Sequence, residues 1–237
     1  GEMPVCAVAT RAVREASNRE EFVRRVREKT GINVEVVPWE EEARLTLEGV
    51  FWKIPDMGKT TLTFDIGGGS TVFILSQGWQ FVASFGTLLG VGRLTEKFIT
   101  QHPIDAGEFH RLEIHVRSEL QTVKKALSAS NPAILIGTAG TVTTVAALEK
   151  NLFPYDPLKV HNTLLKRERI QALLDDLKGK TLEERLRLKA LERGREDVII
   201  AGMAIILETM RVFECEELTV SEYSLREGIL LKAMKTK

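Results

Sequence analysis

Several features that mark other protein classes are missing from this sequence of 237 residues. Cysteine occurs only at Cys6 and Cys215, with no Cys-x-x-Cys or Cys/His cluster, so we do not expect a structural zinc site. We expect both cysteines to be reduced thiols. No apolar run approaches the roughly 18 residues of a membrane-spanning helix, and no signal-peptide pattern is present. We therefore expect no membrane association and, by default, a cytoplasmic location.

An excess of charge of one sign is also missing. Lys and Arg together number 33, as do Asp and Glu, so the formal net charge is zero. Proteins that bind nucleic acids through bulk electrostatics usually carry a strong basic excess, and no nucleic-acid partner is expected here. A neutral total still allows a local basic pocket for a small anion. The hydrophobic share of 43% is typical of a globular protein with one large domain or two small ones.

Strand and helix patterns alternate along the chain, which favours an α/β fold. Asn18 with Glu21, and Thr181 with Glu184, have the spacing of helix-capping pairs. Residues 150–163 are expected to be irregular, and residues 56–59 are turn-rich and mark a domain boundary. We expect strands near 5–9, 32–37, 60–65, 71–76, 80–85, 133–137 and 217–221. Helices are expected near 18–31, 40–47, 91–100, 105–127, 167–177, 197–213 and 225–234, with a further helix that ends at Leu148 and one that begins at the Thr181–Glu184 capping pair.

Two glycine turns stand out because each follows an apolar strand: "DIGGGST" at 65–71 and "GTAGT" at 137–141. Glycine lets main-chain N–H groups approach a ligand closely, and successive N–H groups in such a turn form an anion-binding concavity. The residues of interest are Asp65, Gly67, Gly68, Gly69, Ser70 and Thr71 in the first turn, and Gly137, Thr138, Gly140 and Thr141 in the second.

Asp65 would repel a bare phosphate held in the first turn, and a bridging Mg²⁺ would remove that conflict because it binds one or two carboxylates together with phosphate oxygens. The alternative is structural: the three glycines make a tight hairpin that Asp65 caps. In the second turn, helix capping and ligand contact are equally compatible with the residues.

These motifs resemble the exopolyphosphatase and guanosine pentaphosphate phosphohydrolase family, which is part of the actin-like ATPase superfamily. "DIGGGST" is similar to the second phosphate-binding motif of the family, and "GTAGT" to its third glycine turn. Residues 9–50, "REDVIIAGMAIIL" at 195–207 and "LREGIL" at 225–230 match further family segments in the same order. The resemblance covers nearly the whole chain and implies an actin-like α/β fold with a ribonuclease-H-like core.

The resemblance also implies roles for single residues. Glu42, just before "ARL", would polarise the attacking water, and Asp65 would act at the phosphate site through Mg²⁺. Arg14, whose planar guanidinium suits oxyanions, would contact polyphosphate oxygens. Phosphate binding is expected from Gly67, Gly68, Gly69, Ser70, Thr71, Gly137, Thr138, Gly140 and Thr141.

The implied function is release of terminal phosphate from inorganic polyphosphate or guanosine pentaphosphate. The alternative is a module that binds polyphosphate or a guanosine penta- or tetraphosphate without turnover. Two departures motivate it: the first phosphate loop, Asp-x-Gly-Ser-Asn-Ser in the family, is not found, and Val72 stands where the family often has Glu. Trp39, where the family usually has a small residue, either narrows the cleft or packs.

The implied organisation is a partial first domain over residues 1–55 and a second domain over residues 56–237, with the last helix returning towards the first. The cleft between the two domains is where we expect the site, since ligands commonly bind between domains. The resemblance leaves open whether the protein is a monomer or a homodimer.

Overall fold

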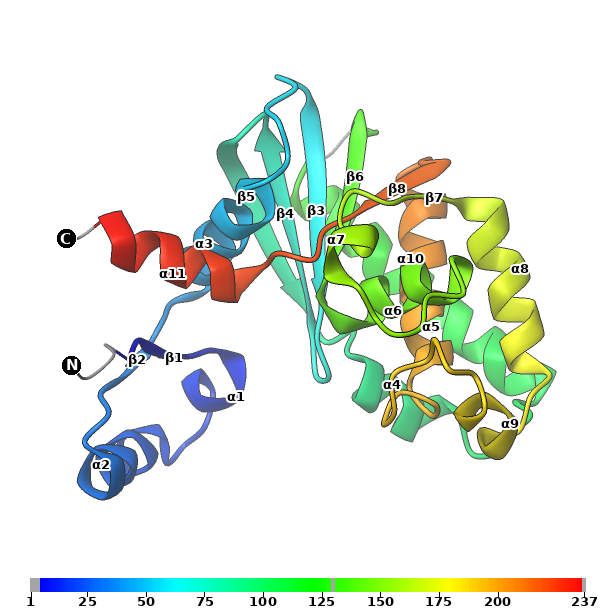
Figure 1. Ribbon diagram of the computed structural model, residues 1–237, viewed down its shortest axis with the longest axis horizontal. Helices are drawn as coiled ribbons and strands as arrows, with labels where there is room; N and C mark the ends of the chain where they lie inside the picture. The colour runs from blue at the N-terminus through cyan, green and yellow to red at the C-terminus, as the bar shows by residue number, and fades with distance from the viewer. Residues whose placement is uncertain (1–4, 129–130, 236–237) are drawn as a thin grey trace.

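The structure is a computed structural model that describes residues 5–128 and 131–235. A small N-terminal unit comes first and lies apart from the large sheet at the lower left of Figure 1. Its two strands are parallel and form a separate two-stranded sheet. The unit consists of β1 (Ala7–Ala9), α1 (Arg11–Arg14), α2 (Arg19–Thr30) and β2 (Val34–Val36).

A six-stranded sheet in the order β5-β4-β3-β6-β8-β7 is the centre of the molecule. Strands β3, β4 and β5 form an antiparallel meander, while β3, β6 and β8 are parallel neighbours and β7 is antiparallel to β8. The carboxyl ends of the three parallel strands therefore meet at one edge. The strands are β3 (Thr60–Ile66), β4 (Thr71–Gln77), β5 (Gln80–Thr87), β6 (Ile134–Thr138), β7 (Leu164–Lys166) and β8 (Glu217–Val220).

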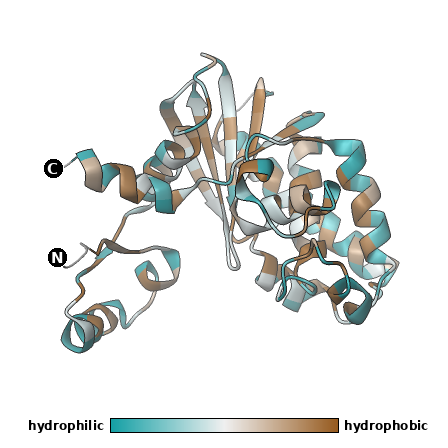
Figure 2. Ribbon diagram, in the orientation of Figure 1, coloured by the Kyte–Doolittle hydropathy of each residue, from teal (hydrophilic) through white to brown (hydrophobic). Residues whose placement is uncertain are grey.

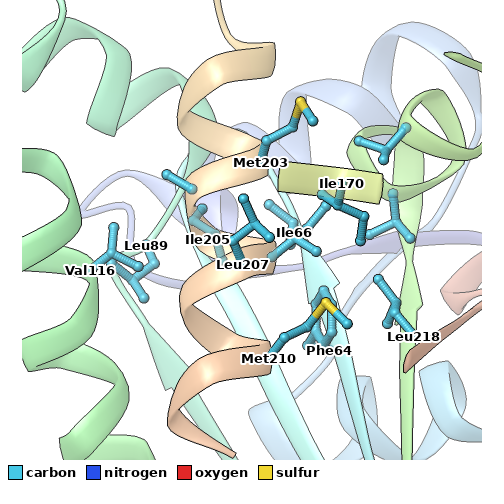
Figure 3. Close-up of a cluster of buried hydrophobic side chains, with 14 of the residues drawn as sticks. Phe64, Ile66, Leu89, Val116, Ile170, Met203, Ile205, Leu207, Met210 and Leu218 are labelled. Carbon is cyan, nitrogen blue, oxygen red and sulfur yellow. The ribbon is translucent and has the colours of Figure 1, made fainter. Parts of the chain in front are cut away.

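Helices cover one face of this sheet and enclose the larger hydrophobic core. The apolar α10 is buried among α4, α5, α6 and α8, and Figure 3 shows its Met203 and Leu207 in the same buried cluster as Phe64 and Ile66 of β3. Figure 2 shows α8 alternating between hydrophobic and hydrophilic residues, as expected for a helix with one buried face. These helices are α4 (Val91–Phe98), α5 (Ala106–Ala126), α6 (Ala139–Glu149), α7 (Pro157–Val160), α8 (Arg167–Lys178), α9 (Leu182–Leu186) and α10 (Ile199–Val212).

The opposite face of the sheet is covered by α3 (Trp39–Phe51). Side chains alternate between the faces of a strand, so Phe64 of β3 enters the larger core while Asp65 points to the α3 side. Asp65 is paired in register with Val72 of β4, which packs against α3. The sequence thus places a carboxylate at the end of a buried strand, on the face that the helix with Glu42 covers.

The last helix, α11 (Leu225–Lys235), packs against α3 through two glycines. A Cβ atom added to Gly49 would lie 1.8 Å from the Ser224 carbonyl oxygen, and one added to Gly228 would lie 1.8 Å from the Leu45 carbonyl oxygen. Only glycine at both positions allows this approach, which brings the start of α11 to the edge where the parallel strands end.

Most of the predicted elements are found, with differences at capping and in short segments. The Thr181–Glu184 capping box is confirmed. The predicted cap at Asn18 is wrong in detail, because its side chain makes no capping hydrogen bond. The prediction omits α1 and β7, and the stretch 150–163, expected to be irregular, includes α7. The boundary between residues 55 and 56 stays a prediction.

Within residues 5–128 and 131–235, no helix combines the length and apolarity needed to span a bilayer.

Candidate active site

Asp65 lies almost at the carboxyl end of β3, next to the residue with which the strand ends. Its Oδ2 accepts a hydrogen bond of 2.6 Å from the Ser224 hydroxyl, just before α11. Burial raises the pKa of Asp65, the hydrogen bond from Ser224 lowers it, and the negative charge of Glu42 raises it further. Burial and the charge of Glu42 therefore both disfavour the ionised form of Asp65, and a positive charge bound nearby would stabilise that form.

Glu42 is in the first turn of α3 and forms an ion pair with Arg14 of the N-terminal unit. Arg14 Nη1 donates to Glu42 Oε2 at 2.7 Å and to the Val37 carbonyl oxygen at 2.8 Å. Both side chains are mostly buried, with 12% and 13% of their surface exposed. The two residues that the resemblance assigned to substrate and water thus meet, and Asp65 is their neighbour.

The first glycine turn connects β3 to β4 and rests against the start of α4. The Gly67 N–H donates to the Ser70 carbonyl oxygen at 2.8 Å, and the Gly67 and Gly68 carbonyl oxygens accept from the amides of Val91 and Gly92. Within the described residues, the amides of Gly68, Gly69 and Ser70 donate no hydrogen bond. A Cβ atom at Gly68 or Gly69 would meet nothing within 4 Å, so this side of the turn is open to a ligand.

Thr71 follows the turn but its side chain is completely buried. Its hydroxyl donates to the Leu89 carbonyl oxygen, and its own carbonyl accepts from the Thr87 hydroxyl at 3.2 Å. A phosphate-binding role for the Thr71 hydroxyl would require breaking the first of these bonds. Ser70, which is partly exposed, is the residue of this turn with an accessible hydroxyl.

The second glycine turn leads from β6 into α6 and is more tightly packed. A Cβ atom at Gly137 would lie 2.9 Å from the Phe64 ring, so this glycine makes room for the core. The Thr138 hydroxyl donates to the Tyr223 carbonyl oxygen at 3.0 Å, and the Thr141 methyl group packs against Gly202.

Gly140 is the member of the second turn that lies beside a cation. A Cβ atom there would lie 1.9 Å from Nη2 of Arg195, which places the Arg195 guanidinium directly against the first turn of α6. Gly140 also lines a cavity of about 950 Å³, together with Ser224 and Arg195. This cavity adjoins the edge where the parallel strands end.

The structure therefore brings Arg14, Glu42 and Asp65 together, with the open glycine turn directly following Asp65. Sequence reasoning missed Ser224, the partner of Asp65, and Arg195, the neighbour of Gly140. No local signal marks Ser224, because 159 residues separate it from Asp65. The described residues contain no group of three or more His, Cys, Asp or Glu side chains arranged to hold a metal ion. Asp65 and Glu42 are the oxygen donors available near the turn for a hard divalent cation.

Comparison with known proteins identifies relatives over almost the entire chain. The model of the Ppx/GppA phosphatase family matches residues 3–237. Exopolyphosphatase 2 of Mycobacterium tuberculosis is 30% identical over 233 residues, which is 94% of this chain and 73% of the relative.

Solved structures give the same result. The crystal structure of the Aquifex aeolicus member of the Ppx/GppA family superposes with a TM-score of 0.88 at 36% identity, over 98% of this chain and 74% of that one. An exopolyphosphatase from Cytophaga hutchinsonii superposes with a TM-score of 0.87 at 27% identity, over 99% of this chain and 76% of that one. The expected actin-like α/β fold is confirmed.

Proposed function

Because this chain belongs to the Ppx/GppA phosphatase family, we propose that it is a hydrolase that releases terminal phosphate from inorganic polyphosphate. The observation that carries the proposal is the meeting of Arg14, Glu42 and Asp65 beside a glycine turn with unused amides. Phosphoryl transfer depends mainly on positioning and on electrostatic stabilisation, and these groups supply both.

In the proposed reaction, the Glu42 carboxylate orients a water molecule towards the terminal phosphorus atom and accepts its proton. The water oxygen forms the new P–O bond while the bridging P–O bond breaks, and the bridging oxygen leaves with the shortened chain. The amides of Gly68, Gly69 and Ser70 and the Arg14 guanidinium hold the phosphate oxygens.

A divalent cation, with Mg²⁺ as our proposal, fits the donors that are present. Asp65 and Glu42 are two carboxylates close enough to repel each other, and a divalent cation held by Asp65 would relieve that repulsion. When bound, it would neutralise charge on the transferred phosphoryl group. Ser224 keeps the Asp65 carboxylate oriented through its hydrogen bond.

Replacing Glu42 by glutamine tests the proposal. Glutamine keeps the shape but cannot accept the proton, so we expect phosphate release from polyphosphate to fall by about a hundredfold or more. The matched control is Glu40→Gln on the same helix turn, where the exposed pair with Arg44 is lost and activity should remain within about twofold. The proposal is wrong if E42Q releases phosphate at the wild-type rate.

Guanosine pentaphosphate is the second substrate that we propose, on account of the 950 Å³ cavity beside Gly140. Its walls combine apolar side chains such as Leu152 and Leu188 with the carboxyl group of Glu222 and with cationic side chains such as Arg195. A nucleotide, which has both an apolar base and anionic phosphates, suits this mixed lining. If the base binds there, Glu222→Gln should raise KM for guanosine pentaphosphate and leave KM for polyphosphate unchanged. Equal effects on both substrates, or no turnover of the nucleotide, would contradict this assignment.

The alternative of a binding module predicts a different pair of results. Val72 is buried against α3 and offers no carboxylate beside the turn, which is the observation in favour of this alternative. Calorimetry would then detect Mg²⁺-dependent binding of polyphosphate, while the phosphate-release assay would give no signal above that of E42Q.

A further inference from the structure

Trp39, at the start of α3, lies against two guanidinium groups of the N-terminal unit. The Arg14 Cζ atom is 4.1 Å from the centre of the Trp39 ring system, and the Arg11 Cζ atom is 5.3 Å from it. Both distances are within the range of cation–π attraction, for which tryptophan is the strongest partner among the aromatic residues. One neutral side chain thus contacts two cations, each of which is also paired with a carboxylate: Arg11 with Glu15 and Arg14 with Glu42.

The Trp39 ring packs against Gly86 of β5, the edge strand of the large sheet. A Cβ atom added to Gly86 of β5 would lie 2.7 Å from two carbon atoms of the Trp39 ring, so only glycine leaves room for the ring. Gly86 precedes Thr87, which pairs in register with Thr71 at the end of the first glycine turn. Arg11 Nη1 donates to the Thr87 carbonyl oxygen at 2.9 Å. The Trp39 ring therefore connects both arginines to the strand that borders the glycine turn.

The hydrogen bonds of Arg14 leave part of its guanidinium unused. Nη1 donates to Glu42 and to the Val37 carbonyl oxygen, whereas Nε and Nη2 are buried without a hydrogen-bond partner in the described part of the chain. Buried N–H groups without partners are costly, and their retention here suits a group that donates to a ligand. The contact with the Trp39 ring limits the positions that this guanidinium can take.

We propose that Trp39 is a positioning residue that, seated on Gly86, holds Arg14 and Arg11 side by side so that they bind successive phosphates of a linear polyphosphate. The inference rests on the proposed function, since Arg14 and Glu42 belong to that site. It goes beyond that function by assigning phosphate binding to Arg11 and a specificity role to Trp39 and Gly86. A chain of linked phosphates supplies two anionic groups for two guanidinium groups, whereas single inorganic phosphate supplies one.

Two independent variants remove the contact without changing any charge. Trp39→Leu removes the aromatic face, and Gly86→Ala displaces the ring from its seat. We expect each to raise KM for polyphosphate by about 3- to 30-fold, the range given by loss of a cation–π contact, with a smaller change in kcat. Trp39→Phe keeps a weaker aromatic face and should restore part of the loss. The control is Trp79→Phe in the β4–β5 turn, where the side chain is 53% exposed and KM should not change.

A second measurement uses binding without turnover. Wild-type and W39L protein are titrated in a calorimeter with imidotriphosphate, whose P–N–P bridges resist hydrolysis, and with inorganic phosphate. We expect W39L to weaken imidotriphosphate binding by the same 3- to 30-fold and to change phosphate binding less. Equal loss for the two ligands, or a lower melting temperature with unchanged KM and Kd, would overturn the inference and leave Trp39 as a packing residue.

The outcomes separate this inference from the proposed function. If wild-type protein releases phosphate but W39L and G86A keep the wild-type KM and Kd, the inference alone fails. If wild-type protein binds imidotriphosphate without releasing phosphate from polyphosphate, the proposed hydrolysis fails and the comparison of Kd values still decides the role of Trp39. Failure of wild-type protein to bind imidotriphosphate overturns both.

Discussion

At the scale of single residues, neighbouring side chains with the same predicted role have different surroundings. Ser70 and Thr71 both carry hydroxyls in the first glycine turn, but Ser70 is partly exposed and Thr71 is buried with its hydroxyl donating to the Leu89 carbonyl. A buried hydroxyl with a satisfied hydrogen bond stabilises the fold, whereas an accessible one is free to meet a ligand. The two roles can be separated experimentally.

Thr71→Val, which keeps the shape and removes the hydroxyl, should lower the free energy of unfolding by about 1–3 kcal/mol, because the Leu89 carbonyl loses its donor. Urea denaturation measures the change. Ser70→Ala serves as the control and should alter stability by less than about 0.5 kcal/mol. A Thr71→Val protein as stable as wild type, with a large rise in KM, would instead show that this hydroxyl binds substrate.

At the scale of elements, the crossing of α3 and α11 determines the site. Glu42 is carried by α3, and Ser224, which donates to Asp65, immediately precedes α11. Gly49 and Gly228 allow the two helices to touch through their backbones, so the distance between these elements has little freedom. The geometry of the carboxylates therefore depends on two glycines that lie outside both glycine turns.

Gly228→Ala should be strongly destabilising, because its Cβ atom would lie 1.8 Å from the Leu45 carbonyl oxygen and the helices would have to separate. We expect a loss of about 3 kcal/mol, at the upper end of the usual cost of overpacking, and reduced phosphate release. Gly179→Ala is the matched control, because its Cβ would meet the nearest atom at an ordinary 3.7 Å. Equal thermal stability of the two variants would contradict the tight crossing.

At the scale of the whole molecule, folding lowers the pKa of three histidines from different parts of the chain. Burial is the largest cause that lowers the pKa of His102, His115 and His161, and nearby cationic groups lower it further. The folded state therefore favours their neutral forms. The unfolded chain takes up protons first as the pH falls below about 6.5, so stability is full above that pH and is lost below it, down to the folded pKa values.

We expect these three histidines to lower the free energy of unfolding between pH 7.5 and pH 5.5, each by less than about 1.4 kcal/mol per pH unit. His161→Gln, which keeps an acceptor for the Glu222 amide, should reduce this slope. Urea titrations at several pH values measure the slopes, and an unchanged slope in H161Q would argue against a half-buried neutral imidazole at His161.

Much of the fold was predictable because its signals are local. The alternation in β3 and the stripe along α5 depend on residues a few positions apart, and the Thr181–Glu184 capping box spans three. The short β7 has no such pattern, since its three residues form a strand only by pairing with β8. Asn18 shows the limit of a motif: the spacing is right, but the backbone conformation does not bring its side chain into the capping position.

Short motifs and their succession along the chain are sufficient to predict most of the strands and helices, the two glycine turns and the family. Which side chains meet is instead a property of the tertiary fold. It paired Arg14 with Glu42 across 28 positions, brought Ser224 to Asp65 across 159, and seated Trp39 on Gly86. Such contacts follow from the packing of whole elements, to which each residue contributes only a small part of the free energy, so no local pattern encodes them.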